Sequence, residues 1–159
     1  MGRTDRAELF ITAPREQIYS AMLDPAALEA WLPPDNMRGR VLWFDARPGG
    51  GFRMELTYLD GSQGKSSAHS DITEVTFVEL LAGKRVVQQV MFDSDEPAFA
   101  GTMTMTWTLF EAPDGTVVEI RADDVPPGVS PSDHAIGLAA SLNNLSAYVA
   151  AMPGPLDVS

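Results

Sequence analysis

The chain has 159 residues, no cysteine, and 22 acidic against 11 basic residues, which gives a formal net charge of −11 at pH 7. The lack of cysteine excludes disulfides, thiolate nucleophiles and zinc–thiolate sites, and the negative charge disfavours nucleic acid and anionic membranes as partners. The length predicts one domain, residues 1–159, and because no run resembles a signal peptide or a membrane span, we expect a cytoplasmic protein.

An opening strand and two short helices are predicted first. Residues 3–12 have the pattern of a strand, and Pro14 suits the first position of a helix on which Ile18 and Met22 lie one turn apart. The second helix has Asp24 as its N-cap and ends before Pro33 and Pro34, because proline cannot continue a helix.

Six strand candidates follow the helices. They are residues 38–46, 52–59, 65–80, 85–92, 103–110 and 117–124. Alternation in two of them places large apolar side chains on one face and polar side chains on the other. The apolar faces carry Phe52, Met54, Leu56 and Tyr58 in one strand and Met103, Met105, Trp107 and Leu109 in the other. Each of these strands is therefore predicted to have one buried and one solvated face.

A long terminal helix is predicted after Ser130, its N-cap, with Asp133 in a capping-box-like position. Its apolar stripe must pack against the sheet. The stripe consists of Leu138, Leu142, Leu145, Val149 and Met152. The opposite stripe, of small residues, would allow close approach of a second copy in a homodimer, although solvent exposure explains it equally well. The core should span about residues 3–152, in an α+β domain with helices on one face of an antiparallel sheet.

Three blocks of sequence resemble the START-like (SRPBCC) superfamily, in the branch named after the activator of the heat-shock-protein-90 ATPase. The blocks are ITAPREQIYSAMLDPAALEAWLPP, VELLAGKRVVQQVMFDSDEPAFAGTMTMTWTL and GTVVEIRADDVPPGVSPSDHAIGLAASLNNLSAYV. The resemblance implies a helix-grip fold, in which a curved sheet of about seven strands wraps around the terminal helix. Many members carry Gly-Trp early in that helix, where this chain has Gly137-Leu138. The tryptophan that would fill part of the interior is missing.

Such a fold can leave a cavity between the concave sheet and the helix, and apolar walls would make it a small-molecule site. Ordinary core packing is the alternative for each wall residue. The predicted ligand-binding residues are Phe52, Met54, Leu56, Tyr58, His69, Met103, Met105 and Trp107 from the strands, Trp31, Met37 and Trp43 near the mouth, and Leu138, Leu142 and Leu145 from the helix.

Few polar side chains are candidates for chemistry. His69 could hydrogen-bond a ligand or transfer a proton, or equally be exposed, and Tyr58 or Asn143 could orient the polar end of a ligand. For His134, in the first turn of the last helix, a capping or surface role is favoured over one at the cavity entrance. The spacing of the two histidines indicates no metal site, and no motif indicates a cofactor.

The leading hypothesis is a binding protein that holds a small hydrophobic or aromatic molecule. The first alternative is a cavity-based enzyme of the cyclase, aromatase or hydrolase type, as in some START-like relatives, with His69 as acid or base. The second is a protein-interaction module with a protein partner, which the chaperone-related family name implies.

Overall fold

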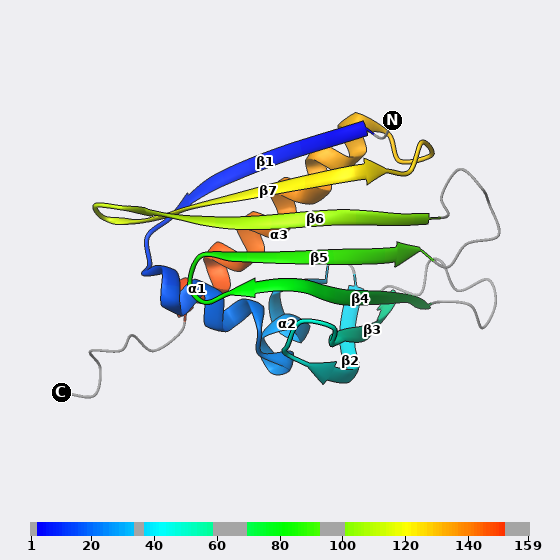
Figure 1. Cartoon of the computed structure of the whole chain (residues 1–159), viewed down its shortest axis with the longest axis horizontal. Helices are drawn as coiled ribbons and strands as arrows, with labels where there is room; N and C mark the ends of the chain where they lie inside the picture. The colour runs from blue at the N-terminus through cyan, green and yellow to red at the C-terminus, as the bar shows by residue number, and fades with distance from the viewer. Residues whose placement is uncertain (1–2, 34–36, 59–69, 93–100, 152–159) are drawn as a thin grey trace.

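The computed structural model describes residues 3–33, 37–58, 70–92 and 101–151 (Figure 1). Strand β1 (Arg3–Ile11) is followed by helices α1 (Arg15–Met22) and α2 (Pro25–Trp31). Six strands come next: β2 (Met37–Asp45), β3 (Gly51–Tyr58), β4 (Ser70–Leu81), β5 (Arg85–Phe92), β6 (Gly101–Ala112) and β7 (Gly115–Val125). Helix α3 (Pro131–Ala151) is the last element. This is the predicted order, and residues 65–69 of the predicted fourth strand lie outside the described residues.

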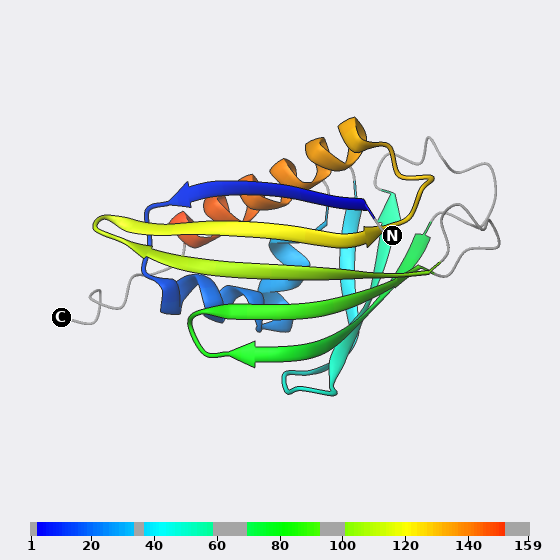
Figure 2. The ribbon, with the colours of Figure 1, turned by 45° about the horizontal axis from the view of Figure 1, so that its top comes forward.

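The seven strands form one antiparallel sheet in the order β1-β7-β6-β5-β4-β3-β2. All three helices lie on the same side of this sheet, and α3 runs diagonally behind β7 and β6 in the view of Figure 1. Figure 2 shows that the sheet twists so strongly that β2 and β3 run across the direction of β5 and β6. The predicted α+β helix-grip fold is confirmed, because a curved antiparallel sheet encloses one face of a long terminal helix.

Helices α2 and α3 begin where their capping residues predict. The Asp24 side chain accepts a hydrogen bond at 3.1 Å from the backbone N–H two residues later, and Ser130 Oγ accepts one at 3.0 Å from the N–H three residues later. Helix α1 begins one residue after the predicted position, since Pro14 has an extended backbone and is itself the N-cap. Of the predicted apolar stripe of α3, Leu138, Leu142, Leu145 and Val149 are buried, and Met152 lies outside the described residues.

The inner face of β7 closes the core on the β1 side of the sheet. Val118, Ile120 and Ala122 are fully buried there, at every second position of the strand. The buried hydroxyl of Thr116 donates a hydrogen bond to the carbonyl oxygen of Ala13 at 2.8 Å, which fixes the start of α1 against the sheet. Helix α3 approaches the sheet most closely at β1, and the buried side chains of β7 fill the interior beside it, whereas the cavity described below lies toward β3–β6.

Candidate functional site

A cavity of about 300 Å³ lies between the inner faces of β3–β6 and the three helices. Most of its surface is apolar. The predicted site residues that line it are Trp31, Phe52, Met54, Leu56, Met103, Met105, Trp107 and Leu138. Further lining residues, which were not among the predicted ligand-binding residues, are Met22, Leu28, Leu32, Thr73, Val75, Gln88, Val90, His134, Gly137 and Ser141.

Strand register explains why these side chains meet. Phe52 pairs with Val75, Val75 with Val90, and Val90 with Met103, so one cross-strand row over four strands lines the cavity. Directly paired residues of antiparallel strands project to the same face of the sheet. Alternation within each strand therefore identified the face, whereas the pairing of the strands determined which residues are neighbours.

Two tryptophans form an apolar corner of the cavity. Trp31 and Trp107 pack edge to face, with ring centroids 5.7 Å apart. Trp31 Nε1 donates to the carbonyl oxygen of Ala21 at 2.9 Å, and Trp107 Nε1 donates to Gln88 Oε1 at 3.2 Å. Because both indole N–H groups have hydrogen-bond partners in the protein, the two rings contribute an apolar surface to the cavity wall. Trp31 is only 2% exposed, so its predicted place near the mouth is wrong and it belongs to the wall.

Trp43 and Met37 do not line the cavity. The pairing of β2 with β3 shifts register between Val41 and Trp43, so Trp43 lies opposite Arg53 and is 43% exposed on the outer face. A bulge adds one residue and reverses the alternation beyond it, which the sequence pattern could not reveal. Met37 lines a separate recess of about 430 Å³ between α2 and α3, together with Asn144.

The face of α3 that meets the cavity differs from the predicted one. It carries His134, Gly137, Leu138 and Ser141, which are spaced as i, i+3, i+4 and i+7. The predicted residues Leu142 and Leu145 are buried in the core but do not line the cavity, and Asn143 is exposed to solvent. Of the apolar stripe of α3, only Leu138 borders the cavity. Leu142 and Leu145, further along the helix, pack in the filled part of the core instead.

Two predicted polar candidates cannot be placed. His69 and the side chain of Tyr58 lie outside the described residues, so their assignment to the site stays a prediction.

His134 takes a role that the sequence interpretation did not favour. Its Nδ1 lies 2.6 Å from Oδ2 of Asp5, and the two side chains are 14% and 15% exposed. Asp5 projects from the inner face of β1 and also accepts two hydrogen bonds from Arg3, at 3.0 and 3.2 Å. The expected capping or surface role is therefore wrong. The available signal was Asp5 itself, a carboxylate at an inward strand position, because such a group needs a partner.

Opposing influences act on the pKa of Asp5. Burial raises it, but hydrogen bonds from His134 and Arg3 and the positive charges of both side chains outweigh burial and hold the pKa below its ordinary value. A carboxyl group whose pKa is lower in the folded than in the unfolded chain stabilises the fold above the unfolded pKa. That contribution is lost as the pH falls through the folded pKa.

We therefore expect Asp5→Asn to reduce the free energy of unfolding at neutral pH by about 1–3 kcal/mol, the usual worth of hydrogen bonds to a charged group. The difference from wild type should begin to shrink below about pH 4, the ordinary aspartate pKa, because Asp5 of the unfolded chain is then protonated, and it should vanish once the pH falls below the lower pKa of Asp5 in the folded chain. Urea denaturation of both proteins at a series of pH values measures this difference in the free energy of unfolding. Asp114→Asn, in an exposed turn, is the control, and a difference for Asp5→Asn that is constant from pH 7 to pH 2 would contradict the account.

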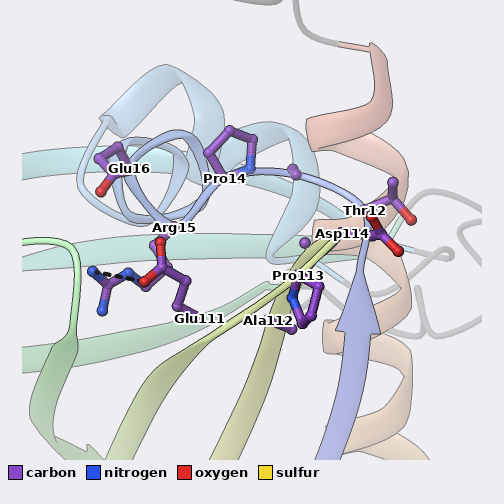
Figure 3. Close-up of a pocket in the computed structure, with 10 residues that line it drawn as sticks. Thr12, Pro14, Arg15, Glu16, Glu111, Ala112, Pro113 and Asp114 are labelled. Carbon is purple, nitrogen blue, oxygen red and sulfur yellow. Dashed lines mark ion pairs between the residues drawn. The ribbon is translucent and has the colours of Figure 1, made fainter.

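A second recess, of about 410 Å³, lies where the start of α1 meets the turn between β6 and β7. Figure 3 shows Arg15 turned toward Glu111, with which it forms an ion pair at 4.0 Å. Glu16 and Asp114 also line this recess, and Figure 3 shows Asp114 beside Thr12, away from Arg15. The Glu111 side chain is largely exposed, and such ion pairs contribute little to stability or specificity. We therefore take the apolar cavity as the candidate site.

Two further properties concern the described part of the chain, residues 3–33, 37–58, 70–92 and 101–151. Within it, no three histidine, aspartate or glutamate side chains lie close enough together to hold a metal ion. No helix in these ranges combines the length and the hydrophobicity needed to cross a membrane.

Comparison with solved structures supports this architecture. A Chromobacterium violaceum protein is 32% identical, with 92% of this chain and 96% of that chain covered and a TM-score of 0.81. A Mesorhizobium loti protein is 18% identical over 95% and 99% of the two chains, with a TM-score of 0.75. An AHSA1-like protein from Aeromonas hydrophila is 20% identical over 94% and 93%, with a TM-score of 0.72.

No curated protein matches the chain significantly. A sequence profile described as Activator of Hsp90 ATPase homolog 1-like protein matches residues 12–150. This match begins just after β1 and covers every later element, from α1 to α3, except for the last residue of α3. The chain belongs to the Activator of Hsp90 ATPase homolog 1-like protein family.

Proposed function

We propose that this protein binds a small lipophilic molecule in the cavity between β3–β6 and α3. The observation that supports this is the cavity itself, about 300 Å³ bordered mostly by methionine, tryptophan, phenylalanine and leucine side chains. Small-molecule pockets begin at about this volume and are mainly apolar with a few polar groups. The fold family is compatible with many functions, so the proposal rests on the site.

Burial of apolar surface would supply most of the affinity, at about 25 cal/mol per Å². Methionine side chains are flexible and polarizable, so Met54, Met103 and Met105 can adapt to ligands of different shape. The polar lining side chains are Thr73, Gln88, His134 and Ser141, and they can orient a ligand without dominating its binding.

A thermal-shift titration with neutral naphthalenes, such as 2-acetylnaphthalene and 2-ethylnaphthalene, tests the proposal. At a concentration of about 100 times Kd, a ligand adds roughly 2.7 kcal/mol to the free energy of unfolding, so the melting temperature should rise saturably by several degrees. Amide chemical-shift changes should concentrate on β3–β6 and the first half of α3. No shift with any compound of the series, or changes confined to the outer face, would refute the proposal.

A cavity-based enzyme is the second candidate, and the specific observation for it is the pair of His134 and Asp5. The carboxylate on Nδ1 orients the imidazole, which leaves Nε2 to accept or donate a proton. The test is hydrolysis of 2-naphthyl acetate, with release of 2-naphthol. A rate above buffer that His134→Ala removes would support an enzyme, whereas equal rates with both proteins would exclude this route. A reaction that uses His69 stays a prediction.

A protein partner, a homodimer and a cytoplasmic location also stay predictions. The outer face of the sheet offers one feature for a partner. Phe10 and Phe110 are 47% and 50% exposed, and both pair with Val117, so the three side chains form one cross-strand row.

A further inference from the structure

We propose that the ligand carries a hydrogen-bond acceptor of the carbonyl class on its apolar body, and that the Gln88 side-chain amide donates to this acceptor. The inference rests on the proposed function, because it concerns a ligand of the same cavity. It specifies the chemistry of that ligand as a neutral ketone, ester or amide.

Gln88 is a buried polar residue in an apolar wall. It lies on the inner face of β5, pairs with Phe77 of β4 on one side and Met105 of β6 on the other, and is only 8% exposed. It also lines the cavity. Burying an amide among such neighbours is costly unless its donors and acceptors have partners.

Trp107 fixes the orientation of the Gln88 amide. An indole nitrogen can only donate, so the atom of Gln88 that faces Trp107 Nε1 at 3.2 Å must be the carbonyl oxygen, Oε1. The NH₂ group of the amide is therefore turned away from Trp107. Among the residues that the structure describes, none accepts a hydrogen bond from it. A donor without a protein partner, on a buried residue that lines the cavity, is the kind of group that a ligand acceptor would satisfy.

The rest of the lining favours a neutral acceptor over a carboxylate. No lysine or arginine is among the described residues that line the cavity, and a carboxylate buried beside Gln88 would have no cation to compensate it. His134 could supply a positive charge only at a distance. Asp5, Ala122, Met105 and Gln88 form one cross-strand row, so three interstrand steps of about 4.8 Å separate Gln88 from the carboxylate that holds His134.

A matched pair of probes tests this directly. 2-Acetylnaphthalene and 2-ethylnaphthalene have nearly the same shape, but only the first carries a carbonyl oxygen. Wild type should bind the ketone at least about tenfold more tightly, because the hydrocarbon leaves the amide donor unpaired. Gln88→Met should remove this preference. Gln89→Met, at the next position on the outer face of the same strand, is the matched control and should keep it.

A spectroscopic readout on wild type avoids any dependence on the folding of variants. The infrared carbonyl stretch of bound 2-acetylnaphthalene should lie below its frequency in hexane, because a hydrogen bond weakens the C=O bond. Equal affinity of wild type for both probes, or a stretch at the hexane frequency, would overturn this inference and leave the proposed function intact. Failure of both probes to bind would overturn the proposed function itself.

Discussion

Replacing Leu138 with tryptophan is expected to weaken the binding of 2-acetylnaphthalene at least about a hundredfold, or ~2.8 kcal/mol, while the protein stays folded. Leu138 is buried, lines the cavity and stands next to Gly137, whose added Cβ would meet no atom within 4 Å. Because the Leu138 side chain borders the cavity, a larger indole can extend into it, where it would occupy the volume that the ligand needs.

Leu142→Trp is the matched control for this variant. Leu142 lies one turn further along α3, is equally buried, and does not line the cavity. A larger side chain there must displace packed atoms, and we expect a loss of about 1–3 kcal/mol in the free energy of unfolding. Calorimetric titration and thermal denaturation of both variants measure the two effects. Full ligand binding by Leu138→Trp, or equal destabilisation of both variants, would show that no usable hollow exists beside Leu138.

The largest loss of stability is expected for Gly51→Ala, about 3 kcal/mol or more. Gly51 begins β3 and pairs with Thr76 of β4. A Cβ built at this position would collide with the backbone oxygen of Val75, and no rotation of a side chain can relieve that collision. The strands must separate there. Because Phe52 and Val75 both line the cavity, the same separation should also abolish ligand binding.

Gly137→Ala provides the comparison. An alanine there meets open space and should stabilise α3, since glycine inside a helix costs about 1 kcal/mol. Urea denaturation of the two variants should therefore give changes of opposite sign. A Gly51→Ala protein as stable as wild type would mean that β3 and β4 do not approach each other as closely as the structure shows.

The order of elements and the fold could be predicted from the sequence because each rests on local chemistry. Asp24 and Ser130 have side chains that cap a helix wherever they precede one, and alternation along 103–110 requires one buried face in any sheet. The family resemblance then supplied the order of layers. The same reasoning correctly predicted the inward face of β3 and β6, including Met54, Met105 and Trp107.

The site was predicted less completely, for identifiable physical reasons. Trp43 lies on the outer face of the sheet and not at the cavity, because β2 contains an extra residue before it. Nothing in the local sequence pattern signals that bulge. Gln88 looked like an ordinary polar residue of a strand, since its partner Trp107 is nineteen positions away. His134 could be assigned only with Asp5, which lies 129 residues earlier in the chain.

The sequence by itself determined which faces are apolar, where helices begin and end, and that no cysteine chemistry takes place, because these depend on residue type and near neighbours. Only the tertiary structure decided which face of α3 borders the cavity and which polar side chains meet there. Strand register and the crossing of α3 over the sheet bring together residues that are distant in the chain, and no local pattern encodes those pairings.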